Sequence, residues 1–113
     1  MSDQKSKTSD FALRVEAGVD RGKVFPLLTE RMAVGRSNVA DIEIHEVFAA
    51  RRHFEIIWVE ETRPHGIRTW SINAVFINGV ELDRNADSLK MLKEGDLILL
   101  GDTVFVYDRL TDK

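Results

Sequence analysis

Hydrophobic and polar residues alternate in short runs along most of the chain. Phe11, Leu13 and Val15, for example, are each followed by a small or charged residue. Strict alternation over a few residues is typical of a β-strand with one buried face. Turn-forming residues separate the runs at intervals of roughly eight to twelve residues, and this spacing favours antiparallel strands over helices.

The runs and turns together predict about ten or eleven short strands. Gly18–Gly22 and Asn78-Gly79 suit hairpin turns, and residues 63–66 form another expected turn. The run Phe54–Val59 is rich in aromatic and β-branched residues and is expected to be a central strand. We therefore predict an all-β protein, a β-sandwich of mostly antiparallel strands. The expected strands span residues 11–16, 24–28, 32–34, 41–44, 54–59, 67–70, 75–77, 80–82, 97–100 and 104–107.

The length of 113 residues suits one small domain. Residues 1–10 contain one apolar side chain, Met1, and too little apolar surface to offset the entropy of ordering. We expect them to form a disordered polar tail. The folded domain is then expected at residues 11–108, with a short C-terminal tail at residues 109–113.

Charge and cysteine content narrow the classes of function. The formal net charge is −3, so no overall positive field attracts nucleic acid or an anionic membrane. The absence of cysteine excludes disulfides and every zinc site built on thiolates. No apolar run is long enough for a signal sequence or a membrane span. We expect a soluble cytoplasmic protein that binds neither nucleic acid nor membranes.

No group of residues fits a catalytic or metal site. In Gly18–Val24 the glycines are too close for a phosphate loop, and a valine stands where serine or threonine is needed. His45-Glu46 cannot begin a zinc motif because Ala49 occupies the place of the second histidine. Ser71 has no base supplied by a local motif. We predict no enzyme activity, no metal and no cofactor.

Two basic segments and one histidine remain as candidate binding residues. Arg36 lies in a loop of turn formers, and Arg51-Arg52 lie where a loop meets a strand. Arginine is ordinarily exposed, so a solvated surface would also account for them. His53 precedes an apolar strand and is expected to be a partly buried residue whose hydrogen bonds fasten a loop.

Taken together, these segments resemble the forkhead-associated (FHA) domain, a phosphothreonine-binding β-sandwich. The resemblance covers residues 11–108, and its motifs occur in the family's order and spacing. They are Gly35-Arg36-Ser37, Asp41–Ile44, Ala50-Arg51-Arg52-His53, Ser71–Gly79 and Leu92–Gly101.

The resemblance implies an eleven-stranded sandwich of the SMAD/FHA type whose loops at one end bind phosphothreonine in an extended peptide. It implies that Arg36 is the main phosphate ligand, that Arg51 is a second basic contact and that Asn73 holds the peptide backbone. The chemistry agrees with this, because a phosphate group carries up to two charges and the fork of a guanidinium can bind two of its oxygens.

The same loops supply the remaining predicted site residues. Ser37, Ala50 and Ile72 complete the phosphopeptide-binding set. Gly35 and His53 are expected to shape the loops rather than to touch the ligand. The expected partner is a threonine-phosphorylated protein or peptide.

The chain departs from the family at positions that bear on binding. Ala50 replaces a serine that binds phosphate, and Ala74-Val75 replaces a glycine-threonine pair. Phe48, Ile72 and Val75 are expected to make the loops apolar, and exposed apolar clusters often mark interfaces. Two hypotheses result. One is a phosphothreonine-reading signalling module with a partly degenerate pocket. The other is a module that binds a partner or oligomerises without phosphate.

Thr8 lies in the expected tail. A phosphate added there could reach the loops of the same domain or of a neighbouring copy. Self-association is therefore a second possible mode of interaction, but a solubilising tail is the favoured explanation of this composition.

Overall fold

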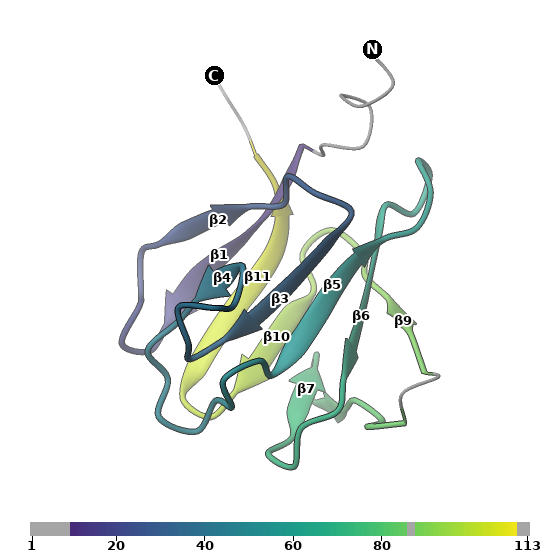
Figure 1. The fold of residues 1–113 in the computed structure, drawn as a ribbon. Coiled ribbons are helices and arrows are strands. Elements are labelled where there is room, and N and C mark those ends of the chain that lie inside the picture. The colour runs from purple at the N-terminus through teal and green to yellow at the C-terminus, as the bar shows by residue number, and fades with distance from the viewer. Residues whose placement is uncertain (1–9, 86–87, 111–113) are drawn as a thin grey trace.

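The computed structural model describes residues 10–85 and 88–110, which form two packed β-sheets (Figure 1). The all-β prediction is confirmed, because every element among the described residues is a strand, and none of these residues belongs to a helix that could cross a membrane. The strands are β1 (Phe11–Ala17), β2 (Val24–Pro26), β3 (Arg31–Gly35), β4 (Ile42–Glu43), β5 (Phe54–Trp58), β6 (His65–Thr69), β7 (Val75–Ile77), β8 (Val80–Glu81), β9 (Lys90–Met91), β10 (Leu97–Leu100) and β11 (Thr103–Arg109).

The strands form a six-stranded sheet in the order β2-β1-β11-β10-β7-β8 and a five-stranded sheet in the order β4-β3-β5-β6-β9. Every pairing is antiparallel except that of β3 with β4. The expected central strand, β5, is the middle strand of the second sheet. The first and last strands pair from Phe11 opposite Arg109 to Ala17 opposite Val104, so the two ends of the domain lie side by side.

Two features of the second sheet differ from the prediction. The short strand β9 was not expected, because two residues give no alternation to recognise. His65 and Gly66 were expected in a turn but begin β6. The turn closes earlier, where the Val59 amide donates to the carbonyl of Pro64 over 2.6 Å, and His65 then packs between aromatic rings.

The ends of the chain lie partly outside the described residues. Of the expected N-terminal tail only Asp10 is described, and Thr8 and residues 111–113 are not. Strand β11 continues to Arg109, one residue past the expected end of the domain. The amide of Leu110 donates a hydrogen bond to the carbonyl of Asp10.

The core lies between the two sheets. Phe54 of β5 and Phe105 of β11 meet edge to face there, with ring centroids 5.7 Å apart. Buried aliphatic side chains surround this pair. They include Leu13, Val15, Val34, Ile44, Ile56, Ile67, Val75, Ile98 and Leu100. This rigid core fixes the strand ends from which the loops emerge.

Four connections gather at the end of the sandwich away from Phe11 and Arg109, the lower end in Figure 1. We call residues 36–41 the arginine loop, residues 44–53 the histidine loop and residues 70–74 the asparagine loop. The turn at residues 101–102 joins β10 to β11. These four connections form the candidate site.

Candidate functional site

Arg36 is the first residue after β3, and its side chain is exposed. Its amide donates to the carbonyl of Ala50 over 2.9 Å, and its Nε donates to the carbonyl of Ala49 over 3.2 Å. These two bonds fix the guanidinium against the histidine loop. Its terminal nitrogens form no hydrogen bond with any described residue. The fork of the guanidinium is therefore oriented and available for an anion.

Gly35 lets the backbones of β3 and the histidine loop approach closely. A Cβ atom at Gly35 would lie 2.0 Å from the carbonyl oxygen of Arg51 and 2.8 Å from the Cα of Arg52. Real side chains do not tolerate such distances, so only glycine fits. The close approach brings Arg36 and Arg51-Arg52 to the same end of the sheet.

His53 is completely buried and joins two of the site loops. Its Nδ1 accepts a hydrogen bond from the Ala50 amide over 2.9 Å, and its Nε2 lies 2.8 Å from the carbonyl oxygen of Asn73. Burial lowers the pKa of His53, and the hydrogen bond to Asn73 opposes this only in part. The neutral imidazole, with its proton on Nε2, satisfies both partners.

Asn73 is exposed in the asparagine loop, and its Nδ2 donates to the carbonyl of Phe48 over 2.8 Å. Its Oδ1 accepts no hydrogen bond from the described part of the chain. The amide is thus fixed in orientation with an acceptor left free. Next to it, the side chain of Ile72 is 81% exposed.

Ser37 shapes the arginine loop. Its Oγ accepts a hydrogen bond from the amide of Val39 over 3.2 Å, which leaves the hydroxyl proton free for another acceptor. Ala50 is exposed, and its backbone is fixed on both sides by Arg36 and His53. The methyl group of Ala50 therefore stands on a backbone that is hydrogen-bonded directly to the backbone of Arg36.

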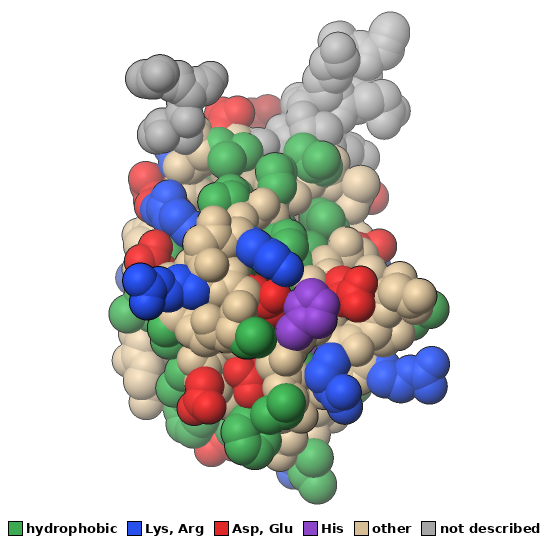
Figure 2. Space-filling view, turned by 90° about the vertical axis from the view of Figure 1, so that its left-hand side faces the viewer, with side chains coloured by type: hydrophobic (Ala, Val, Ile, Leu, Met, Phe, Trp, Pro, Cys, Tyr) green, Lys and Arg blue, Asp and Glu red, His purple; other side chains and the backbone are tan. Residues whose placement is uncertain are grey.

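The positive charge of the site comes from three arginines rather than from a broad basic face. Arg51 and Arg52 are exposed, and neither they nor Arg36 form an ion pair with a described residue. Figure 2 shows the side of the molecule that carries β2 and β4, where basic, acidic and apolar side chains are intermixed. An anion is thus favoured at the loops by local charge.

The sequence did not indicate two buried carboxylates that hold the loops. Glu46 accepts hydrogen bonds from the amides of Phe48 and Asp102, both over 3.2 Å, and from the hydroxyl of Thr103 over 2.6 Å. It ties the histidine loop to the turn between β10 and β11. Its partners in that turn lie 56 and 57 residues away, so no local pattern reveals them.

Asp20 has a similar role at the turn between β1 and β2. It accepts hydrogen bonds from the amide of His45 over 2.7 Å and from Lys23 over 3.0 Å, and its Oδ1 lies 2.8 Å from the His45 ring. Burial alone would raise the pKa of Asp20, but these hydrogen bonds outweigh it and hold the pKa below its usual value. The carboxylate anchors the start of the histidine loop.

A shallow apolar depression adjoins Asn73. Phe48, Ala74 and Phe76 line it together with the turn at residues 101–102, and its volume is about 300 Å³. Phe48 is 51% exposed. Val75 begins β7, in agreement with the strand expected at residues 75–77, but its side chain lies in the core and does not make the asparagine loop apolar.

The two-sheet sandwich thus presents an oriented arginine and an oriented asparagine on neighbouring loops. Residues 32–101 match the profile of the FHA domain, and the chain belongs to this family. The resemblance found in the sequence is thereby confirmed. FHA domains are interaction modules, not enzymes. No curated protein matches the sequence.

Solved structures show the same fold. The FHA domain of an Arabidopsis thaliana hypothetical protein is 22% identical, with a TM-score of 0.79 over 95% of this chain and 91% of its own. That of CT664 from Chlamydia trachomatis is 26% identical, with a TM-score of 0.76 over 89% of this chain and 98% of its own. The N-terminal FHA domain of Rad53p from S. cerevisiae, solved in complex with a phosphothreonine peptide, is 19% identical, with a TM-score of 0.71 over 87% of this chain and 93% of its own.

Proposed function

We propose that this domain binds threonine-phosphorylated peptides and serves as a protein interaction module in signalling. The observation that carries the proposal is Arg36. Its Nε is engaged by the carbonyl of Ala49, while its terminal nitrogens are free and face no carboxylate among the described residues. A phosphate dianion is the ligand that such a fixed, unpaired guanidinium binds best.

The other loop residues supply complementary contacts. Arg51 adds a second positive charge, and the Ser37 hydroxyl can donate to a phosphate oxygen. The free Oδ1 of Asn73 can accept an amide hydrogen from the peptide backbone, so phosphate and backbone are bound at once. The yeast domain solved with a phosphothreonine peptide shares the fold, and this supports a phosphothreonine peptide as the ligand.

The test is a calorimetric titration with a degenerate phosphothreonine peptide pool and with the same pool unphosphorylated. We expect heat of binding from the phosphorylated pool alone, and loss of that heat in Arg36→Ala. The matched control is Arg84→Ala, which removes an exposed arginine that lies outside the site loops. Equal binding of both pools, or full binding by Arg36→Ala, would refute the proposal.

A phosphate-independent interface is the second candidate, including self-association. Phe48 and Ile72 are 51% and 81% exposed on adjacent loops, and large exposed apolar side chains favour protein contacts. In this case a captured partner should survive phosphatase treatment and Arg36→Ala. It should be lost in Phe48→Asp or Ile72→Asp. Loss on phosphatase treatment would exclude this candidate.

A further inference from the structure

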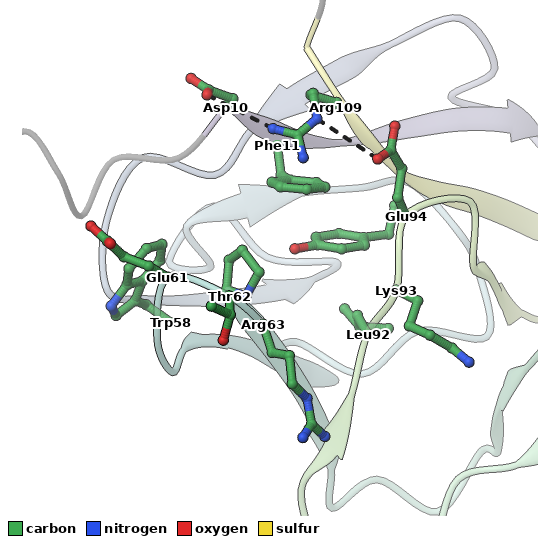
Figure 3. Close-up of a pocket in the computed structure, with 12 residues that line it drawn as sticks. Asp10, Phe11, Trp58, Glu61, Thr62, Arg63, Leu92, Lys93, Glu94 and Arg109 are labelled. Atoms are coloured by element: carbon green, nitrogen blue, oxygen red, sulfur yellow. Dashed lines mark ion pairs between the residues drawn. The ribbon is translucent and has the colours of Figure 1, made fainter.

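A second pocket lies at the opposite end of the sandwich, beside the paired chain ends (Figure 3). Its volume is about 370 Å³, within the range of small-molecule sites. The walls come from the start of β1, the end of β11, the turn between β5 and β6, and the turn between β9 and β10. None of the phosphopeptide-site residues lines it.

Aromatic side chains form the inner wall of this pocket. Phe11 and Tyr107 stack with ring centroids 4.7 Å apart and planes inclined by 7°. Trp58 is half-buried beside them. The hydroxyl of Tyr107 is engaged by the buried His65 over 2.7 Å, so the wall is fixed in place. A flat apolar group would find rigid, complementary surfaces here.

The charged residues at the rim divide into two groups. Arg109 lies 4.5 Å from the centre of the Phe11 ring, and its nitrogens lie 4.0 Å from Asp10 and 3.7 Å from Glu94. The two carboxylates more than balance this arginine, so this side of the rim does not attract an anion. Figure 3 shows the two ion pairs on one side of the pocket.

Arg63 and Lys93 form the second group. Both are exposed and form no ion pair with any described residue. They extend toward the other side of the pocket, on either side of Leu92 (Figure 3). Glu61 is the unpaired acid nearby, so the unpaired side chains of the lining carry a net positive charge. An anionic group is favoured on this side of the pocket, away from Asp10 and Glu94.

We propose that this pocket binds an aromatic acid, with the ring against the aromatic wall at Trp58 and the anionic group toward Arg63 and Lys93. A free small molecule offers this chemistry, and so does an aromatic residue at the carboxyl end of a polypeptide. The site is independent of the phosphopeptide loops, so binding here does not depend on Arg36.

The probes are phenylacetate and the peptide Gly-Gly-Phe with a free carboxylate, each beside its uncharged amide. The chain has two tryptophans, Trp58 and Trp70. In the variant Trp70→Phe the tryptophan fluorescence comes from Trp58 alone and therefore reports on the pocket. Amide shifts of Thr62 and Lys93 in the unaltered protein give a second readout. We expect both readouts to respond to at least one acid and to neither amide.

Charge reversal tests the two cations. Arg63→Glu and Lys93→Glu should each weaken binding at least about tenfold, because a charged hydrogen bond becomes a repulsion. Arg21→Glu makes the same charge change in the turn between β1 and β2 and should leave the affinity unchanged.

The comparison of the two acids identifies the source of the ligand. Tighter binding of phenylacetate indicates a small molecule, and tighter binding of the peptide indicates a chain end. Equal responses to acids and amides, no response to any probe, or full affinity in both charge-reversal variants would overturn the proposal.

Discussion

The Nε2 atom of His53 lies 2.8 Å from the carbonyl oxygen of Asn73, twenty residues further along the chain. This contact joins the histidine loop to the asparagine loop on the buried side of the loops. The other ring nitrogen holds the Ala50 amide. One buried imidazole thus sets the relative positions of the alanine beside Arg36 and of the asparagine expected to bind the peptide.

Replacing this imidazole should destabilise the domain. We expect His53→Ala to lower the free energy of unfolding by about 1 to 3 kcal/mol, because two partly buried backbone groups lose their partners. Urea unfolding measures this loss. The comparison variant His45→Ala removes a histidine that is 56% exposed, and it should cost less than about 1 kcal/mol. If His53→Ala unfolds like the unaltered protein but no longer binds phosphopeptide, His53 is a contact residue instead.

Gly35→Ala tests the close approach of β3 to the histidine loop. The new Cβ would lie 2.0 Å from the Arg51 carbonyl oxygen, and backbone must move to relieve the overlap. We expect a loss of about 3 kcal/mol or more, at the upper end for overpacking. In the control, Gly66→Ala, the new atom meets the exposed side chain of Leu89, which can rotate away. Thermal unfolding compares the two. Equal losses of stability in the two variants would show that the backbone of the histidine loop can move at little energetic cost.

His65 should make the stability depend on pH. Burial lowers its pKa to about 4, whereas the unfolded chain has the usual value of about 6.5. Between these values the unfolded state binds the proton more readily. The contribution of His65 is therefore complete above about pH 6.5 and is lost as the pH falls toward about 4, by about 3 kcal/mol.

The variant His65→Gln isolates this contribution because the other titrating groups remain. Urea unfolding from about pH 7 to about pH 4 covers the range between the two pKa values. As the pH falls over this range, the free energy of unfolding of the variant should decrease less steeply than that of the unaltered protein. Parallel curves for the two proteins would rule out His65 as the source.

Alternation predicted most of the fold because a buried face leaves a period of two in the sequence. β1 and β5 are long enough to show it, and β5 is central as its composition indicated. β9 has two residues and shows no period. The strand expected at residues 75–77 is β7, but Val75 was also expected to make the preceding loop apolar, and its side chain is instead fully buried. Loop and strand ends cannot be separated by pattern alone.

In the candidate site, the sequence predicted only those residues that belong to a motif of the family. Arg36 and Asn73 were indicated by the resemblance, and both lie on the loops at one end. The partners that orient them are the carbonyl oxygens of Ala49 and Phe48. Every residue has a backbone carbonyl, so the sequence does not show which of them makes such a contact. Glu46 was missed because its contacts across the sandwich depend on the fold.

Ala50→Ser tests how far the pocket departs from its family. The backbone of Ala50 is held by Arg36 on one side and by His53 on the other, so a serine adds a hydroxyl without a change of conformation. One further hydrogen bond to a phosphate group should raise phosphopeptide affinity about tenfold, measured by calorimetry.

The outcome of that substitution depends on the neighbouring arginines. If Arg51 or Arg52 already occupies the position of the missing hydroxyl, Ala50→Ser brings no gain while phosphate-dependent binding persists. Binding by the unaltered protein would then weaken steeply with salt, because exposed charges are screened. The double variant Arg51→Ala with Ala50→Ser separates the cases. A serine that restores the affinity lost in Arg51→Ala shows that guanidinium and hydroxyl serve the same phosphate oxygen. No restoration means that they act at different places.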